Sequence, residues 1–225
     1  MKRKIITTSD GSKTIQIEDW DEQYHSIHGA INEANHVFIK HGLHFFCNEF
    51  SKNKNEITIL EIGFGTGLNA YITCLEAEKL KLKINYVGVE AYPVSKEEYN
   101  QLNYAQLISE SHSEIFQKLH NVEWEVISEI SSNFYLEKQK QFFSKIKDQN
   151  RYNIIYFDAF GARVQPELWT ETIFEIMFKA LKNNGVLVTY SAKGSVRRAM
   201  QNVGFQVERL PGPPGKREML RATKH

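Results

Sequence analysis

An alternation of short apolar runs with longer amphipathic stretches from residue 57 onward restricts the fold more than any other feature of this sequence. The apolar runs predict strands at 57–63, 84–90, 122–127, 152–158 and 185–191. The stretches between and after them predict helices at 67–82, 95–119, 131–147, 167–182 and 194–202. Strands that alternate with helices of this length form an α/β domain with a mostly parallel sheet.

Both ends of the chain add antiparallel strands to this pattern. Residues 205–210 and 217–224 also read as strands, and the short link PGPPGK between them has no room for a crossover helix. They are therefore expected to pair antiparallel at the sheet edge, which completes a seven-stranded, Rossmann-like sheet. Residues 3–18 predict a β-hairpin around Asp10-Gly11.

The chain is expected to divide into two parts. Residues 19–50 read as mostly helical, so we predict an N-terminal hairpin and helical extension over 1–50 and the α/β domain over 51–225. The polar run EKQKQFFSKIKDQN, residues 137–150, is predicted to be an amphipathic helix with a solvated face.

Composition places the chain among ordinary globular proteins. Of its 225 residues, 41% are hydrophobic and 24% charged, and the apolar runs are shorter than the roughly 20 residues that span a bilayer. We expect a cytoplasmic protein that contacts no membrane, because no apolar signal core follows the basic start. Cys47 and Cys74 do not have the spacing of a zinc site, and the eight histidines form no metal-binding motif. We therefore expect no metal.

Charge is distributed unevenly along the chain. The net charge is +1, yet residues 185–225 contain eight Lys or Arg and only two Glu, a net of +6. A basic C-terminal segment is typical of proteins that bind polyanions. A scatter of solvated surface lysines and arginines gives the same count, so both interpretations remain open.

The first strand of the α/β domain leads into a glycine-rich turn. Glu61, Gly63, Phe64, Gly65 and Gly67 form the pattern E-x-G-F-G-x-G, and the first helix starts at once. Glycines at alternate positions allow a tight turn and a close approach of backbone N–H groups to a ligand. The spacing differs from the G-x-G-x-x-G fingerprint of dinucleotide-binding enzymes and from a P-loop. A nicotinamide-dependent dehydrogenase remains as the alternative.

Two carboxylates follow neighbouring strands. Glu90 ends the second strand and Asp158 the fourth, and ligands of open α/β sheets bind outside the carboxyl ends of the strands. A carboxylate at position 90 can accept hydrogen bonds from two ribose hydroxyls. Asp158 is expected to meet a substrate, and helix capping or loop bracing is the other interpretation.

The glycine turn followed by an acid on the next strand resembles the class I S-adenosylmethionine-dependent methyltransferases. The resemblance implies that the glycine turn faces the methionine part of S-adenosylmethionine, that Glu90 holds the ribose, and that Glu61 and Asp158 also bind the cofactor. It also places Glu129 beside the adenine, although a surface position for this acid remains open.

Four further motifs resemble the bacterial MnmC/MnmD family over nearly the whole chain. They are YHSIHGAINEANHVFIKHGL (24–43), DAF with PELW (158–169), TYSAKGSVRRAMQNVGF (189–205) and GPPGKREML (212–220). Members methylate the aminomethyl group of the wobble uridine in tRNA, and some are fused to a flavin-dependent oxidase. The resemblance implies the stand-alone methyltransferase form, the anticodon stem-loop as partner, and a separate enzyme upstream that supplies the amine. Gly161-Ala162 depart from the family's usual Ser-Pro or Ala-Pro.

The same resemblance implies roles for individual residues. Asp158 is expected to orient the acceptor amine, with a pKa lowered by that neighbouring cation. Tyr24, His25 and Glu33 are expected either to line the pocket or to pack as its roof. The residues expected to bind the substrate are Phe160, Arg163, Tyr190, Lys193, Arg197, Arg198, Lys216 and Arg217. A methyltransferase for small molecules or proteins, or a non-catalytic RNA-binding module, remain the alternatives to a tRNA methyltransferase.

Overall fold

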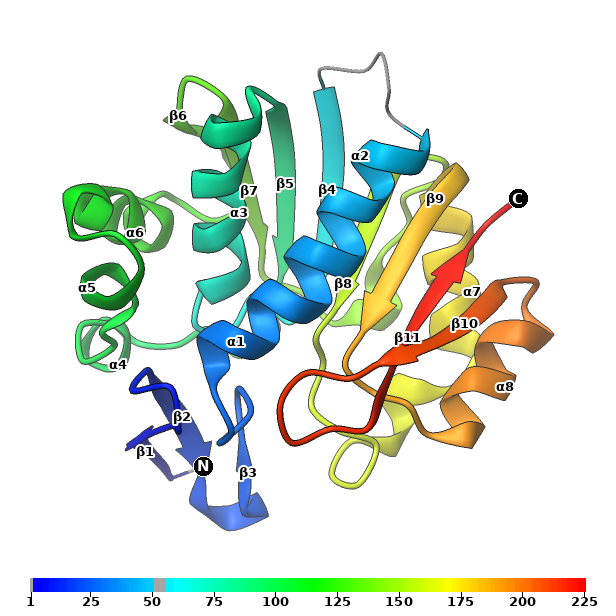
Figure 1. Cartoon of the computed structure of the whole chain (residues 1–225), viewed down its shortest axis with the longest axis horizontal. Coiled ribbons are helices and arrows are strands. Elements are labelled where there is room, and N and C mark those ends of the chain that lie inside the picture. The colour runs from blue at the N-terminus through cyan, green and yellow to red at the C-terminus, as the bar shows by residue number, and fades with distance from the viewer. Residues whose placement is uncertain (1, 51–55) are drawn as a thin grey trace.

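The computed structural model describes residues 2–50 and 56–225. Within these residues an eight-stranded sheet has the order β10-β11-β9-β8-β4-β5-β7-β6 (Figure 1). Strands β9, β8, β4, β5 and β7 are parallel, whereas β11, β10 and β6 run antiparallel to their neighbours. The strands are β4 Glu56–Ile62, β5 Lys83–Val89, β6 Ile127–Ser131, β7 Phe134–Gln139, β8 Tyr152–Phe157, β9 Leu181–Thr189, β10 Gln206–Pro211 and β11 Glu218–Thr223. The α/β class and the antiparallel C-terminal pair are confirmed.

Helices cover both faces of the sheet. On one face lie a continuous helix made of α1 (Ala30–Ala34), η2 (Asn35–His44) and α2 (Phe45–Phe50), then α3 (Leu68–Leu80) and the short helices α4 (Lys96–Tyr99), α5 (Tyr104–Ile108) and α6 (Ser113–Asn121) (Figure 1). On the other face lie α7 (Glu171–Ala180) and α8 (Gly194–Asn202).

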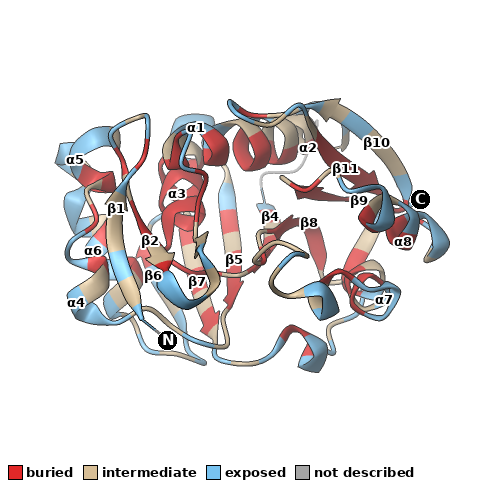
Figure 2. Ribbon diagram, turned by 90° about the horizontal axis from the view of Figure 1, so that it is seen from below, coloured by how far each residue is buried: buried red, intermediate tan, exposed pale blue. Residues whose placement is uncertain are grey.

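The central strands are buried because both of their faces are covered (Figure 2). Along β4, Ile57 and Ile59 pack toward α3 and η2, whereas Leu60 and Ile62 pack toward α7 and α8. A strand buried on both faces reads as a continuous apolar run, which explains why the sequence pattern located β4 and β8 so closely.

The N-terminal hairpin is also confirmed. β1 (Arg3–Thr7) pairs antiparallel with β2 (Lys13–Ile17), and β3 (Glu22–Gln23) adds a third, short strand. Gly11 in the turn has a φ of +82°, which favours glycine. A 3-10 turn, η1 (Glu18–Trp20), leads into β3. The division into parts at residue 50 stays a prediction.

The predictions for residues 122–147 were wrong. The strand expected at 122–127 begins only at Ile127, and the helix expected at 131–147 is replaced by β7 and the 3-10 turn η4 (Phe143–Lys145). β6 and β7 form a hairpin, so the sheet has eight strands rather than seven. Alternate residues of β7 are buried, among them Lys138, whose Nζ donates to the backbone oxygen of His120 at 2.6 Å. A buried lysine conceals the alternation that identifies a strand.

Among the helices within residues 2–50 and 56–225, none combines the length and the apolar character that a membrane span requires.

Candidate functional site

A cavity of about 540 Å³ opens at the carboxyl ends of β4, β5 and β8. Its size lies within the range of small-molecule and cofactor sites, about 300–1,000 Å³. The glycine turn after β4, the segment after β5, the loop after β8 and the N-terminal segment all contribute lining residues. This is the ligand edge of the sheet that the sequence pattern indicated.

Gly63 and Gly65 of the turn line this cavity. Their φ angles are +89° and +46°, and the amides of Gly63 and Phe64 both donate to the backbone oxygen of Val89. A Cβ atom on Gly63 would lie 2.7 Å from the backbone oxygen of Asp158. Glycine at position 63 therefore lets the turn after β4 touch the loop after β8.

The other residues of the motif lie outside the cavity lining. Gly67 has a φ of +72° and is the N-cap of α3. The Phe64 ring packs against Gly88 and lies edge-on to His120. Glu61 is fully buried, and its Oε1 accepts from the Asn69 side chain at 2.9 Å. The side chains of Glu61 and Phe64 support the turn from behind and are not placed for direct contact with a ligand in the cavity.

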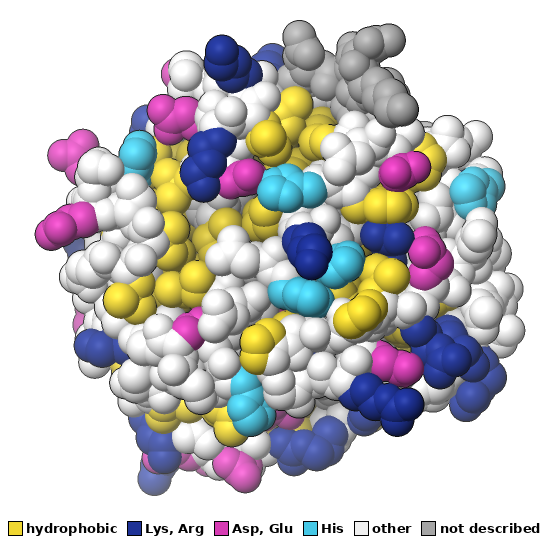
Figure 3. Space-filling view, in the orientation of Figure 1, with side chains coloured by type: hydrophobic (Ala, Val, Ile, Leu, Met, Phe, Trp, Pro, Cys, Tyr) yellow, Lys and Arg dark blue, Asp and Glu magenta, His cyan; other side chains and the backbone are white. Residues whose placement is uncertain are grey.

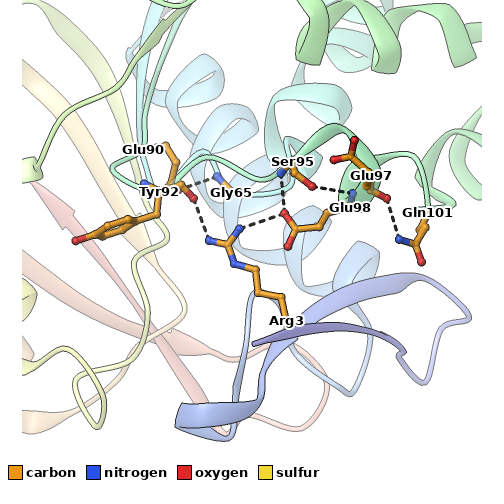
Figure 4. Close-up of polar contacts among 8 residues, drawn as sticks. All are labelled: Arg3, Gly65, Glu90, Tyr92, Ser95, Glu97, Glu98 and Gln101. Atoms are coloured by element: carbon orange, nitrogen blue, oxygen red, sulfur yellow. Dashed lines mark hydrogen bonds and ion pairs between the residues drawn. The ribbon is translucent and has the colours of Figure 1, made fainter. Parts of the chain in front are cut away.

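Glu90 lines the cavity directly after β5. Its Oε2 accepts from the Gly65 amide at 3.1 Å, and its Oε1 accepts from the Tyr92 amide at 2.9 Å (Figure 4). Burial raises the pKa of Glu90, while these two hydrogen bonds and the nearby Arg3 oppose that rise. The carboxylate is therefore held in one orientation at the point where a ribose is expected.

Arg3 is a cavity-lining residue that the sequence analysis did not identify. Its guanidinium donates to Glu98 Oε2 at 3.2 Å and to the backbone oxygen of Tyr92 at 3.1 Å (Figure 4). It also lies over the Tyr24 ring, 5.6 Å from the centroid. The contact joins β1 to the segment after β5. The sequence does not reveal this contact, because Tyr92 and Glu98 lie about ninety residues from Arg3 along the chain.

Asp158 lines the cavity directly after β8. Its Oδ2 accepts a 2.8 Å hydrogen bond from Asn69. Burial raises the pKa of Asp158 to about 7, the charge of Glu33 adds to the rise, and Asn69 and Lys216 oppose it. Desolvation therefore dominates in the protein alone, and the lowering expected from an acceptor cation beside Asp158 stays a prediction. A pKa near 7 suits a group that exchanges protons at neutral pH.

The N-terminal motif supplies the roof of the cavity. Tyr24 and His25 line it, and the Tyr24 ring covers Gly65. His25 Nε2 lies 2.7 Å from Thr66 Oγ1, and burial lowers the pKa of His25 to about 4, so this imidazole is neutral at pH 7. Glu33 is not part of the lining. Its Oε2 accepts from the Ser26 amide at 3.0 Å.

Aromatic rings form the wall of the cavity next to Asp158. The Phe160 ring lies edge-on to Trp20 and to Tyr24, with centroids 5.7 and 4.9 Å apart, and all three residues line the cavity. Trp20 was missed because the irregular segment around it has no periodicity. Trp169 is buried in the core, and its Nε1 donates to the backbone oxygen of Phe160 at 2.8 Å.

Three residues expected to bind the substrate have partners within the protein. Arg163 donates to the backbone oxygens of Trp20 and Asp21 and pairs with Glu22 at 3.1 Å. The Lys216 ammonium pairs with Glu33 and lies 3.8 Å from the centroid of the Tyr190 ring. The Tyr190 hydroxyl donates to the backbone oxygen of Ala159 at 2.8 Å. Since none of the three lines the cavity, they contact the segments around it from outside.

The remaining basic residues lie on the C-terminal elements. Lys193, Arg198 and Arg217 are exposed, and Arg197 is half-buried. Figure 3 shows Lys and Arg side chains gathered at the lower right, where α8 and β10 lie in Figure 1. An RNA-binding role for these four residues stays a prediction.

Two further expectations concern acids and metals. Glu129 is exposed on β6, opposite Tyr135, far from the carboxyl end of β7. Glu129 does not line the cavity, in agreement with the surface position left open for it, and its expected place beside the adenine followed from the misplaced strand at 122–127. In the described part of the chain, no group of three or more His, Cys, Asp or Glu could hold a metal ion.

Comparisons with known proteins agree with this geometry. Residues 99–225 match a family described as S-adenosyl-L-methionine-dependent methyltransferases. The "tRNA 5-methylaminomethyl-2-thiouridine biosynthesis bifunctional protein MnmC" of Marinomonas sp. is 27% identical over 214 residues, 89% of this chain and 31% of that protein. The protein of the same name from Actinobacillus pleuropneumoniae serotype 5b is 28% identical over 229 residues, 92% of this chain and 33% of its own. This chain thus spans about a third of the length of these relatives.

Two solved structures resemble this chain to different degrees. MNMC2 from Aquifex aeolicus superposes with a TM-score of 0.81 at 25% identity, over 100% of this chain and 70% of that one. Spermidine synthase from Thermotoga maritima, at 13% identity and a TM-score of 0.55 over 98% of this chain and 72% of that one, shares the fold alone.

The cavity residues fit S-adenosylmethionine. Gly63, Gly65 and Glu90 line the cavity together, so exposed backbone and a carboxylate are available to a bound ligand. The rings of Tyr92 and Phe142, which also line it, meet edge to face with centroids 6.1 Å apart. From the match over more than half of its length and this agreement of the site, the chain belongs to the family of S-adenosyl-L-methionine-dependent methyltransferases.

Proposed function

We propose that this protein methylates the nitrogen of the aminomethyl group on the wobble uridine of tRNA, giving a methylaminomethyl group. The relatives are named for the biosynthesis of tRNA 5-methylaminomethyl-2-thiouridine, and N-methylation of an aminomethyl group yields that substituent. The observation that carries the proposal is the Asp158 carboxylate, which lies beside the glycine turn at one end of the cavity with a pKa near 7.

The residues around Asp158 suit an amine acceptor. An alkylammonium must lose a proton before its nitrogen can attack, and a carboxylate of matched pKa accepts that proton. S-adenosylmethionine supplies the activated methyl group when it is bound. The protein holds the amine in line and excludes water, and such positioning alone lowers a barrier by several kcal/mol.

The aromatic wall suits a pyrimidine base. Single-stranded RNA is read by splaying bases out and stacking them on aromatic side chains. Trp20 and Phe160 offer such surfaces beside Asp158. The exposed Lys193, Arg198 and Arg217 would contact phosphates of the anticodon stem-loop. A cytoplasmic location, where tRNA is modified, and a separate upstream enzyme that supplies the amine belong to the same proposal.

Labelled S-adenosylmethionine tests the proposal directly. The protein is incubated with bulk tRNA from cells that lack the modification and, separately, with a metabolite extract and a protein extract. Label in a tRNA nucleoside identified by mass spectrometry as methylaminomethyluridine, or its 2-thio form, supports the proposal. Label only in small molecules or proteins, or tight tRNA binding without label, overturns it.

A variant pair assigns the chemistry. Asp158→Asn is expected to depress turnover at least a hundredfold and to leave S-adenosylmethionine affinity within about threefold. Asp148→Asn is the matched control, because Asp148 pairs with Arg151, away from the cavity. Equal losses of turnover and of cofactor binding in Asp158→Asn would remove Asp158 from the acceptor role.

A further inference from the structure

One side-chain amide joins two carboxylates beneath the cavity. Asn69 Nδ2 donates to Glu61 Oε1 at 2.9 Å and to Asp158 Oδ2 at 2.8 Å. Asn69 is 2% exposed and Glu61 is fully buried, so water does not take over either bond. Neither residue lines the cavity, whereas Asp158 does.

The arrangement determines the orientation of the amide. An asparagine side chain has two N–H hydrogens, and each carboxylate takes one of them. Glu61 belongs to the central strand β4, and Asn69 is the second residue of α3. The backbone oxygen of Asn69 accepts a hydrogen bond from the Thr73 hydroxyl at 2.6 Å. The strand and the helix thus hold the donor fixed, and Asp158 must place its Oδ2 against it.

We propose that Asn69 is a positioning residue that binds Oδ2 of Asp158 and so leaves Oδ1 as the oxygen that accepts the proton of the acceptor amine. Among the described residues, Oδ1 has no hydrogen-bond partner. The proposal rests on the function proposed above. In the step, one proton moves from the ammonium nitrogen to Oδ1, and the nitrogen keeps the electron pair for methyl transfer.

Charged groups on the other elements around Asp158 act together with Asn69. Glu33 on α1 raises the pKa of Asp158, and Lys216 on the β10–β11 loop lowers it. Burial raises the pKa of Glu61 well above its usual range, and the charge of Asp158 adds to that rise. The tyrosines that face Asp158 are Tyr86, Tyr104 and Tyr190, all with pKa values raised by burial. Asn69 is thus the neutral donor that favours the carboxylate form.

The test replaces the donor by an apolar side chain of similar size. In Asn69→Leu the pKa of Asp158 is expected to rise by at least one unit, measured on the ligand-free protein by carbon-13 NMR of the carboxyl groups with Asp158→Asn for assignment. The acidic limb of kcat/KM is expected to move to higher pH by the same amount. Affinity for S-adenosylmethionine is expected to stay within about threefold.

Two further variants keep the test decisive. Asn85→Leu is the matched control, since Asn85 Nδ2 also donates to a carboxylate, Glu56 Oε1, at the amino end of the sheet, and the variant is expected to leave both pH curves unchanged. Asn69→Ser keeps a short donor and is expected to give a smaller shift, which can be measured if the leucine variant does not fold. Unchanged Asp158 titration in either folded Asn69 variant overturns the proposal. The NMR titration needs no substrate, so failure of the tRNA assay with a shifted titration would count against the proposed function alone.

Discussion

Lys216 and Glu33, 183 positions apart in the sequence, form an ion pair next to the acceptor end of the cavity. The ammonium lies over the Tyr190 ring, and the Glu33 side chain is only 7% exposed. The β10–β11 loop is thereby tied to the first helix. This lysine was expected to bind RNA phosphate, and the structure gives it a partner inside the protein.

Removal of the Lys216 ammonium should destabilise the folded protein. Lys216→Met leaves a buried carboxylate without its cation, and we expect the free energy of unfolding to fall by about 3 kcal/mol, the lower end for a broken buried pair. The pKa of Asp158 should rise, because Lys216 lowers it in the intact protein. Urea titration and the pH profile of kcat/KM measure the two effects.

The double variant is the control for this pair. Glu33→Gln combined with Lys216→Met removes both charges, and we expect it to regain much of the lost stability. If the stability lost in the double variant equals the sum of the losses in the two single variants, the ion pair carries no coupling energy.

Gly63→Ala should damage both halves of the site. The alanine would need a φ of +89° and would bring its Cβ to 2.7 Å from the Asp158 backbone oxygen. We expect a loss of about 2 kcal/mol or more in stability and weaker binding of S-adenosylmethionine. Gly194→Ala is the matched control, because Gly194 starts α8 and its nearest neighbour is the flexible end of Arg198. Thermal melting measures the stability of the two variants, and calorimetry measures their affinity for S-adenosylmethionine. Equal stability and affinity in both variants would contradict the close contact between the turn after β4 and the loop after β8.

Glu90→Gln should weaken cofactor binding while the fold is kept. Loss of a charged acceptor costs about 1.5–3 kcal/mol, which corresponds to an increase in Kd of roughly 10- to 150-fold. Glu129→Gln changes the same chemistry on the exposed strand β6, and its Kd should match the wild type. A loss in the Glu129 variant instead would restore the adenine-side role that the fold argues against.

Acid should destabilise the protein through two histidines. Burial lowers the pKa of His25 and of His120 to about 4, whereas an unfolded histidine titrates near 6.5. Between these values the unfolded chain binds more protons, so stability present above pH 6.5 is lost as the pH falls toward 4. We expect about 2 kcal/mol per histidine to be lost by pH 5. The raised pKa of Asp158 acts in the opposite direction over the same range, so each histidine is measured as the difference between the wild type and its variant. Urea titrations from pH 7.5 to 5 measure this slope, and His120→Phe, which keeps an aromatic ring against Tyr99, should flatten it.

The salt dependence of tRNA binding should test the role of the basic C-terminal surface. Each exposed phosphate contact that is removed is expected to reduce the slope of log K against log salt by about 1 and to weaken tRNA binding. Lys193→Ala with Arg198→Ala tests this surface. Lys83→Ala, at the amino end of the interior strand β5, is the control. Identical salt slopes for all variants would mean that tRNA does not lie across α8.

The sequence predicted those parts of the site that lie next to a strand end. Gly63, Gly65, Glu90 and Asp158 each follow a buried strand, and the parallel sheet brings these ends to one edge. Periodicity locates such strands, so the positions follow without knowledge of the helices.

What could not be predicted depends on contacts between distant segments. Arg3 reaches Tyr92 and Glu98, and Trp20 meets Phe160, across segments with no shared pattern. β7 was mistaken for a helix because its buried Lys138 reads as a surface residue until its partner at His120 is known.

The tie between residues 33 and 216 also has a consequence for synthesis of the chain. A ribosome makes Glu33 long before Lys216, and domains generally fold as whole units. β11, which inserts between β9 and β10, is made later than both of its neighbours. A nascent chain therefore carries an acid without its cation and an unpaired sheet edge until β11 emerges. The ion pair beside Asp158 forms only after that point, so a shorter nascent chain lacks the completed wall of the cavity.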